Sequence, residues 1–521
     1  MKIEKGKLFR LYQIDPVRPC AIGEGVWQAR KMRAAWDRKT RRVRKGVFIT
    51  ELRNRDSVVN PRSIELAFDQ GTLILRGWDR RQLEKYFNDP VWSWDYRAGC
   101  WRTDALHYQN VSARLCSQPE IDCRDTVANW MDVRIAPQKL HALRTDQMEA
   151  LDGWLKNRRG LVVMPTGTGK TEVALHAICQ SACSVLVVSP VRDLMYQWHD
   201  RILAALGIDA GIIGDGVHRV SPISVTTYDS AAIHMPRLGN QFKLIIFDEC
   251  HHLPGPMRQD AARMSAAPWR LGLTATPERR DGQEHLLNEL IGPRVYTQAI
   301  QAARGKTLAE YDIIRMAVHL SAEERLRYQS LGKTVQTFIS ERRKDQPDYD
   351  WQTLCSDSGH DPQARAAMIA FHAKRSIEDR ASDKLRIIED LFRLHAGEPV
   401  IVFCGSNAMA RDVSLRFLIP CLLSHCLKRE RKEILSGLNE GRYPALVANR
   451  VLDEGVDLPE VNVAIVVGGG SSTRQALQRL GRVVRKNRFG RACLYEIVTA
   501  NTRDELRSRA RRRNDAFHKA K

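Results

Sequence analysis

The stretch Leu161-Val-Val-Met-Pro-Thr-Gly-Thr-Gly-Lys-Thr171 decides the fold of this chain. Its first four residues are apolar and predict a buried strand, and Lys170 opens a predicted helix. The small residues between them form a loop whose backbone N–H groups can surround a polyphosphate, while Lys170 reaches the outer phosphates and Thr171 holds Mg²⁺. The match is incomplete, because Met164 stands where the P-loop pattern has glycine. The loop residues are Pro165, Thr166, Gly167, Thr168 and Gly169.

A second apolar strand ends in two adjacent carboxylates, in Leu244-Ile-Ile-Phe-Asp-Glu-Cys-His251. Asp248 at the strand end can bind Mg²⁺ through its water shell, and Glu249 can polarise the attacking water. A lone Asp-Glu pair is more often a solvated strand end than a site. Downstream of a P-loop the pair instead predicts a nucleoside triphosphatase, with ATP and Mg²⁺ as its ligands.

Apolar strands alternate with amphipathic helices around these motifs, which is typical of parallel α/β sheets. One such run extends from about residue 135 to residue 296, and a second begins near residue 383. Two α/β lobes, with the phosphate loop on the first, imply a site at their junction. The predicted strands are Leu161–Met164, Val185–Ser189, Ile223–Thr227, Leu244–Asp248 and Leu271–Ala275 in the first lobe, and Val400–Cys404, Ala445–Ala448, Val463–Val467 and Leu494–Ile497 in the second.

The segments outside the two lobes differ in composition. Residues 299–382 are polar and favour helix, and we expect no strand there. Residues 1–135 contain seven of the eleven Trp residues, and Asp69–Leu75 and Trp101–Tyr108 suggest short strands. This part of the chain is therefore predicted to be a separate α+β or β-rich domain.

The net charge of +21 is concentrated at the two ends of the chain, with +10 in residues 1–50 and +5 in residues 501–521. A basic terminus can be a solubilising tail. Beside an ATP-driven motor, binding to the phosphate backbone of nucleic acid is the better interpretation.

Composition predicts a reduced, cytoplasmic protein associated with the nucleoid. The first thirty residues are charged and lack the apolar block of a signal peptide. The uncharged stretch Val173–Val191 divides into a helix and a strand, so we expect no membrane span. The twelve cysteines show no spacing typical of a zinc site, and we interpret Cys179/Cys183 and Cys421/Cys426 as small buried apolar residues.

Further candidate site residues follow the same order of elements. Arg144 and Gln147 precede the P-loop, and Gln147 can read the adenine edge by hydrogen bonds. Loops at the carboxyl ends of parallel strands are where ligands bind, and Thr274-Ala-Thr276 there can link the nucleotide site with a bound strand. On a helix in the second lobe Gln478, Arg482 and Arg485 share one face. The two arginines can neutralise charge on the transferring phosphoryl group, an effect worth roughly 10³–10⁵ in rate.

This ordered set of motifs resembles the superfamily 2 helicases, and three segments look like the XPB family of DNA repair helicases, in particular its shorter archaeal-type members. The similarity covers about residues 65–515 and is loose in 299–382. The three segments are Asp248-Glu-Cys-His-His-Leu-Pro254, Leu271-Gly-Leu-Thr-Ala-Thr-Pro-Glu-Arg279 and Val451-Leu-Asp-Glu-Gly-Val-Asp457.

The resemblance implies an ATP-dependent DNA translocase and 3′→5′ helicase with two RecA-like lobes, a damage-recognition domain and a helical thumb between the lobes. It implies nucleotide contacts at Gly455 and Asp457, and DNA or coupling contacts at Pro190, Arg192, Thr227, Thr274, Thr276, Arg279, Arg280 and Asp281. The expected domains are a basic extension (1–65), a damage-recognition-like domain (66–135), lobe 1 (136–298), a thumb-like insertion (299–382), lobe 2 (383–500) and a basic tail (501–521).

Two features leave alternatives open. The family has an Arg-Glu-Asp element thought to help open the duplex, and Arg279-Arg280-Asp281 replaces its central carboxylate by a cation. We expect this replacement to affect separation of the DNA strands more than ATP hydrolysis or translocation. Trp92, Trp94 and Trp101 either stack on bases or form the core of the small domain.

The expected partner is duplex, forked or damaged DNA, together with a partner nuclease, and RNA is the less favoured substrate. One alternative is the motor subunit of a mobile-element or anti-phage restriction-type system. Another is an ATP-switched clamp on damaged DNA that unwinds little.

Overall fold

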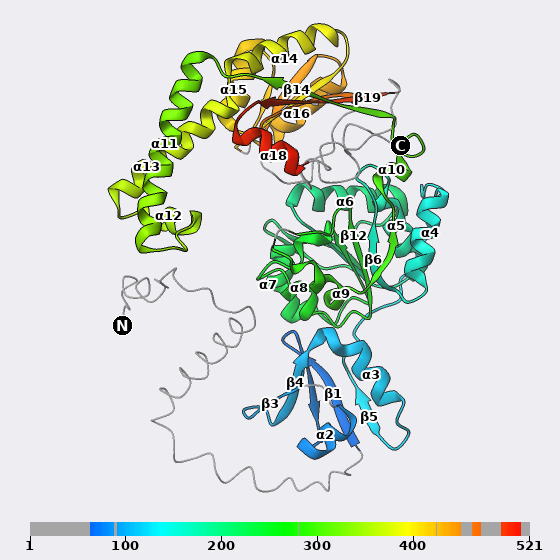
Figure 1. Cartoon of the computed structure of the whole chain (residues 1–521). Helices are drawn as coiled ribbons and strands as arrows, with labels where there is room; N and C mark the ends of the chain where they lie inside the picture. Colours follow the sequence, from blue (N-terminus) through cyan, green and yellow to red (C-terminus); the bar gives the residue numbers. More distant parts are fainter. Residues whose placement is uncertain are drawn as a thin grey trace, which may run out of the picture.

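The computed structural model describes residues 63–87, 91–279, 281–423, 425–449, 461–469 and 491–511. Within them lie a small N-terminal domain, two lobes built on parallel sheets, and a helical arm that extends from the second lobe (Figure 1). The predicted α/β class with two such lobes is confirmed.

The N-terminal domain is a five-stranded sheet in the order β3-β4-β2-β1-β5, with two helices beside it. The prediction of a single strand over Asp69–Leu75 is wrong, because this segment contains a hairpin turn. Gln70 and Gly71 form the turn with positive φ values of 49° and 83°. The elements are β1 Ser63–Asp69, β2 Thr72–Arg76, α2 Arg80–Tyr86, β3 Ser93–Asp95, β4 Cys100–Asp104, α3 Tyr108–Cys116 and β5 Asp122–Asp125.

Lobe 1 has an eight-stranded sheet in the order β13-β6-β12-β11-β7-β10-β8-β9, in which β9 is antiparallel to β8. Alternate residues of its strands enter two separate cores, with Val162 in one and Leu161 in the other, so helices cover both faces. Its strands are β6 Arg159–Val163, β7 Val185–Ser189, β8 Gly211–Gly214, β9 Val217–Arg219, β10 Ile223–Thr227, β11 Leu244–Asp248, β12 Trp269–Thr274 and β13 Arg294–Thr297. Its helices are α4 Thr145–Leu155, α5 Lys170–Ser181, α6 Arg192–Leu206, α7 Tyr228–Leu238, α8 Asp260–Arg263 and α9 Leu286–Leu290.

The N-terminal domain and lobe 1 share packed surfaces. Ala266 of lobe 1 belongs to the core of the N-terminal domain, and Leu106 of that domain belongs to a core of lobe 1. A Cβ atom on Gly239 would lie 2.0 Å from the carbonyl oxygen of Met264 and 2.8 Å from the ring of Phe68. The close approach of the two bodies therefore depends on the missing side chain.

Lobe 2 has a six-stranded parallel sheet in the order β14-β19-β18-β15-β17-β16. Its elements are α10 Ile300–Ala303, β14 Tyr311–Val318, α14 Ser382–Leu394, β15 Val400–Cys404, α15 Asn407–Phe417, β16 Cys421–Leu422, α16 Lys428–Asn439, β17 Ala445–Ala448, β18 Val463–Val467, β19 Ala492–Thr499 and α18 Arg503–Arg511.

The expectation that 299–382 contains no strand is wrong. β14 pairs with β19 along its full length, from Tyr311 opposite Ala492 to Val318 opposite Thr499. The sequence pattern hid this strand, because β14 is an edge strand whose middle residues are partly or fully exposed.

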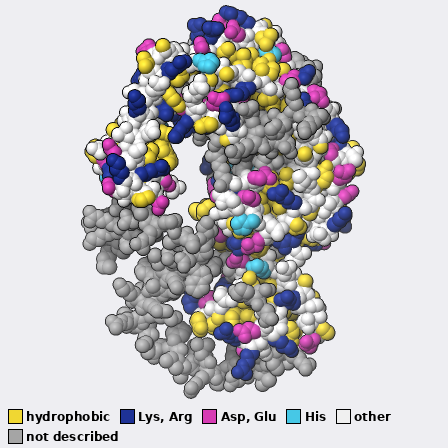
Figure 2. Space-filling model, viewed as in Figure 1, with side chains coloured by type: hydrophobic (Ala, Val, Ile, Leu, Met, Phe, Trp, Pro, Cys, Tyr) yellow, Lys and Arg dark blue, Asp and Glu magenta, His cyan; other side chains and the backbone are white. Residues whose placement is uncertain are grey.

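The helical arm follows β14 and consists of α11 Ala322–Asp345, α12 Trp351–Asp357 and α13 Pro362–Asp379. Ser321 begins α11 with a capping box, and Pro362 occupies the first turn of α13. Tyr328 donates a hydrogen bond of 2.7 Å to Glu378, which joins the two long helices near lobe 2. In the space-filling view an open gap separates the arm from lobe 1 (Figure 2).

Candidate functional site

The predicted phosphate loop lies between β6 and α5. Gly167 and Gly169 have φ values of 88° and 82°, and a Cβ atom on Gly169 would lie 2.4 Å from Nε2 of Gln147. The left-handed conformation at position 169 therefore favours glycine, and a side chain there would displace the Gln147 amide. Lys170 is buried at the start of α5, and its Nζ donates to the carbonyl oxygens of Met164 (3.1 Å) and Pro165 (3.4 Å).

The loop residues suit a nucleotide phosphate with a bound cation. Thr168 is satisfied within the loop, because its Oγ1 donates to the carbonyl of Pro165 at 2.8 Å. The buried Oγ1 of Thr166 has no hydrogen-bond partner among the described residues. A buried hydroxyl of this kind is satisfied when a phosphate oxygen binds beside it. Thr171 is the second residue of α5 and half-buried.

Arg144 and Gln147 hold the loop from the start of α4. Nε2 of Gln147 donates to the carbonyls of Thr168 (3.0 Å) and Gly169 (3.3 Å), and a guanidinium nitrogen of Arg144 also donates to Thr168. The Gln147 Oε1 accepts from the Arg144 backbone N–H at 3.0 Å. These contacts brace the loop backbone, and reading of adenine by Gln147 stays a prediction.

Asp248 ends β11 and points its carboxylate into a buried polar environment. Trp198 Nε1 donates to Oδ2 at 2.8 Å, and the backbone N–H of Glu249 donates to Oδ1 at 3.0 Å. Tyr228 donates from its hydroxyl to the Asp248 carbonyl at 3.0 Å. Burial raises the pKa of Asp248, while the Trp198 hydrogen bond and the Lys170 charge oppose that rise. Sequence reasoning missed Trp198 and Tyr228, since no spacing rule marks them.

The carboxylates connect to the threonine motif through His251. Its Nδ1 lies 3.0 Å from the Thr274 hydroxyl and 3.5 Å from a Glu249 carboxylate oxygen. The Thr274 hydroxyl also accepts from the backbone N–H of Thr276 at 3.2 Å. Polar contacts therefore join the carboxylates to the Thr274–Thr276 motif, and the role of this motif as a link to a bound strand stays a prediction.

The backbone of His251 also contacts the Arg279–Asp281 element. Arg279 Nη1 donates to the His251 carbonyl at 2.5 Å, and its guanidinium makes two bonds to Asp281 at 2.8 and 2.6 Å. The hydrogen bonds from Arg279 lower the pKa of Asp281 to about 2. Arg280 itself lies outside the described residues.

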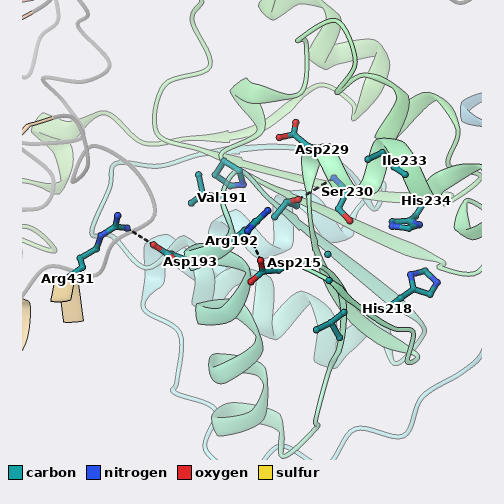
Figure 3. A pocket seen from close by; sticks show the side chains of 15 residues that line it. Val191, Arg192, Asp193, Asp215, His218, Asp229, Ser230, Ile233, His234 and Arg431 are labelled. Atoms are coloured by element: carbon teal, nitrogen blue, oxygen red, sulfur yellow. Dashed lines mark hydrogen bonds and ion pairs between the residues drawn. The ribbon is translucent and has the colours of Figure 1, made fainter. Parts of the chain in front are cut away.

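A separate groove in lobe 1 brings together the predicted DNA contacts Pro190, Arg192 and Thr227. It is a cavity of about 790 Å³, bordered by the ends of β7 and β10 and by the β8–β9 hairpin. Arg431 of α16 enters it from lobe 2 and donates to Asp193 at 2.7 Å (Figure 3). The P-loop residues do not line this groove, so nucleotide and candidate strand sites are distinct.

The burial of the tryptophans favours the core alternative. Trp92 and Trp101 are buried in the core of the N-terminal domain, and Trp94 packs edge-on against Trp101 with ring centroids 5.1 Å apart. Stacking of bases on Trp92 or Trp101 is therefore excluded in this conformation.

Several predicted site residues lie outside the described part of the chain, namely Gln478, Arg482, Arg485, Gly455 and Asp457. Among the described residues, no group of three or more His, Cys, Asp or Glu side chains is arranged to hold a metal ion. The described helices include none that is long and apolar enough to span a membrane.

Comparison with protein families gives three matches along the chain. A damage-recognition domain described for the xeroderma pigmentosum group B helicase matches residues 66–127. The res subunit of type III restriction enzymes matches residues 140–279, and the helicase conserved C-terminal domain matches residues 383–487.

Similar proteins include the DNA 3'-5' translocase XPB2 of Sulfurisphaera tokodaii, which is 40% identical over 81% of this chain and 96% of its own length. The DNA 3'-5' helicase XPB of Kineococcus radiotolerans is 30% identical over 70% of this chain, which spans 61% of that longer relative. The Hef helicase domain of Pyrococcus furiosus has a TM-score of 0.51 at 18% identity, over 72% of this chain and all of the solved chain. That likeness concerns the fold alone.

Proposed function

Because this chain belongs to the XPB family of DNA 3'-5' helicases and translocases, we propose that it is an ATP-dependent motor that moves along DNA and opens or remodels the duplex. The observation that carries the proposal is the buried Asp248 carboxylate. It is fixed by Trp198 in the lobe that also holds the Lys170 loop. The groove that contains Arg192 and Thr227 on this lobe is the proposed site for the strand.

The nucleotide is proposed to be ATP with Mg²⁺. Thr171 and Asp248 would hold the metal, which screens negative charge on the phosphoryl group being transferred. Lys170 is proposed to release its carbonyl contacts and bind the outer phosphates. Glu249 orients the attacking water, and Arg482 and Arg485 are the proposed arginine fingers from lobe 2.

The biological role that we propose is repair of damaged chromosomal DNA in the nucleoid, of the nucleotide-excision type, in cooperation with a partner nuclease. The match of residues 66–127 to a damage-recognition domain supports this role. Direction of movement is proposed to be 3′→5′, as in the names of the relatives.

The test is ATP hydrolysis measured without nucleic acid and with duplex DNA, forked DNA and RNA, beside a strand-displacement assay. We expect DNA to stimulate turnover more than RNA does. Lys170→Ala should lose ATP turnover and keep DNA binding, whereas Lys156→Ala, at an exposed position after α4, should keep both. Turnover that DNA does not stimulate would refute the DNA motor, and full turnover by Lys170→Ala would refute the assigned nucleotide site.

A further inference from the structure

In the candidate DNA groove, the predicted DNA contact Arg192 is already paired with the carboxylate of Asp215. Oδ1 of Asp215 accepts a hydrogen bond of 2.6 Å from Arg192 Nη1 (Figure 3). Its Oδ2 accepts one of 3.0 Å from the Tyr196 hydroxyl. Arg192 and Tyr196 both lie on the first turns of α6. A carboxylate and a phosphodiester each offer two oxygens to such donors, so the two anions compete for the same bonds.

The position of Asp215 is set by a tight hairpin. Asp215 and Gly216 are the two central residues of the β8–β9 turn, with φ values of 54° and 78°, as a two-residue type I′ connection requires. β8 is in turn fixed to β10 by parallel pairing, with Ile213 opposite Thr226. β10 ends at Thr227, so the hairpin tip and the predicted DNA contact belong to one framework.

The pair formed by Arg192 and Asp215 can be reached by a ligand that approaches from the solvent. The Arg192 side chain is 64% exposed and that of Asp215 is 22% exposed, so a bound backbone can reach the pair. A tyrosine hydroxyl is protonated at neutral pH and can donate, and burial and the bond to Asp215 raise the pKa of Tyr196 further. Ion pairs as exposed as this one are weak, so a phosphate can displace the Asp215 carboxylate from Arg192 at a small cost in free energy.

The family resemblance already implies that Arg192 contacts DNA. We propose that Asp215 is an internal competitor for this contact, which a phosphodiester of the nucleic-acid backbone displaces from Arg192 and Tyr196. The inference rests on the proposed function, since it places DNA in this groove. An internal competitor weakens the contact without abolishing it, which suits a motor that grips and releases the strand in each cycle.

The test is DNA binding by Asp215→Asn in the full chain, measured by fluorescence anisotropy with a labelled oligothymidylate and a blunt duplex of equal length. Asn tolerates the positive φ at this turn, so the hairpin is retained, and thermal unfolding checks this. We expect Asp215→Asn to bind at least one of the two DNAs about twofold to fivefold more tightly, the range that corresponds to release of an exposed ion pair. The DNA that shows the gain identifies whether single or paired strands occupy the subsite.

Two further variants separate competition from a general charge effect. Asp229→Asn removes the same charge from the same groove, but Asp229 pairs with Arg258 at 2.9 Å and not with Arg192. The increase in DNA affinity of Asp229→Asn should therefore be clearly smaller than that of Asp215→Asn. In the double variant Arg192→Ala/Asp215→Asn, the gain of Asp215→Asn should disappear.

The inference is overturned if Asp215→Asn binds both DNAs no more tightly, if Asp229→Asn gains equally, or if the gain survives removal of Arg192. DNA-stimulated ATP hydrolysis by the unaltered chain, measured in parallel, distinguishes failure of this inference from failure of the proposed function. If DNA stimulates hydrolysis but Asp215→Asn does not bind DNA more tightly, only the role of Asp215 as a competitor is refuted. If DNA does not stimulate hydrolysis, the proposed motor is refuted as well.

Discussion

At the scale of single residues, the indole of Trp198 orients the carboxylate proposed to hold Mg²⁺. Its Nε1 bonds Asp248 Oδ2 within a buried setting, where an unpaired carboxylate oxygen is costly. Groups that orient a metal-binding carboxylate affect metal binding although they never touch the ion.

Trp198→Phe removes this donor and keeps the aromatic packing. We expect the Mg²⁺ concentration for half-maximal ATP hydrolysis to rise about tenfold, the lower end of such effects. A Mg²⁺ titration of steady-state hydrolysis measures it. Trp154→Phe is the control, because Trp154 is equally buried but donates to the carbonyl of Arg270. An equal shift in both variants would show a general loss of packing.

A second residue-scale prediction concerns Arg280. Arg280→Glu restores the Arg-Glu-Asp element next to Asp281, which Arg279 holds by two hydrogen bonds. We expect faster strand displacement on forked DNA with DNA-stimulated ATP hydrolysis changed less than twofold, about 0.4 kcal/mol. Unchanged displacement would show that this position does not limit strand separation.

At the scale of elements, a buried ion pair ties α18 to α14 in lobe 2. Lys384 Nζ lies 3.0 Å from Asp504 Oδ2, and both side chains are fully buried. Burial would raise the pKa of Asp504, but the charges of Lys384 and Arg507 outweigh it and hold the pKa below 3.8. A lowered carboxyl pKa contributes stability that is fully present above the unfolded-state value and is lost as pH falls through the folded-state value.

Asp504→Ala should therefore destabilise lobe 2 at neutral pH by about 3–5 kcal/mol, because it leaves the Lys384 charge buried without its partner. Thermal or urea unfolding measures this. Asp312→Ala is the matched control, since its ion pair with Arg491 is exposed and worth about 1 kcal/mol or less. Similar losses in both variants would contradict the account.

The elements also show what the sequence can predict. β7 and β11 have the predicted bounds, since each is a short, mostly apolar run buried on both faces. β10 also has its predicted bounds, although Ser and Thr make up three of its five residues. β14 was missed because exposure along its middle leaves no clear pattern. In the site, the loop and carboxylates were found by motif. Trp198 and Asp215 were not, because their partners are distant in sequence and only the folded sheet brings them together.

At the scale of the whole molecule, the N-terminal domain and lobe 1 meet at Gly239. Gly239→Ala places a Cβ atom against the Met264 carbonyl and the Phe68 ring. We expect a loss of about 1–3 kcal/mol by overpacking, seen as a lower unfolding temperature and faster proteolysis between the two bodies. Gly359→Ala is the control, because its nearest contact would be an ordinary 3.4 Å. Intact packing in Gly239→Ala would contradict the predicted clash.

The basic N-terminal segment makes a second prediction at this scale. Residues 1–50 carry a net charge of +10. If they bind the backbone, their deletion should flatten the dependence of DNA affinity on salt, by a slope of roughly 0.9 for each duplex phosphate that the segment neutralises. Anisotropy titrations over a range of salt concentrations measure this slope. An unchanged slope would identify the segment as a solubilising extension.

The pairing of β14 with β19 has a mechanical consequence. The chain joins the lobe 2 sheet before α11 begins and re-enters that lobe at α14, so both ends of the arm are rooted in the same body. The arm is therefore expected to move with lobe 2 as one body. Its 24-residue helix α11 is about 36 Å long, so a lobe rotation of about 10° would carry the far tip through about 6 Å, more than one nucleotide spacing of about 3.4 Å. A rotation of this size, if ATP hydrolysis drives it, would displace the arm far enough to advance along a strand.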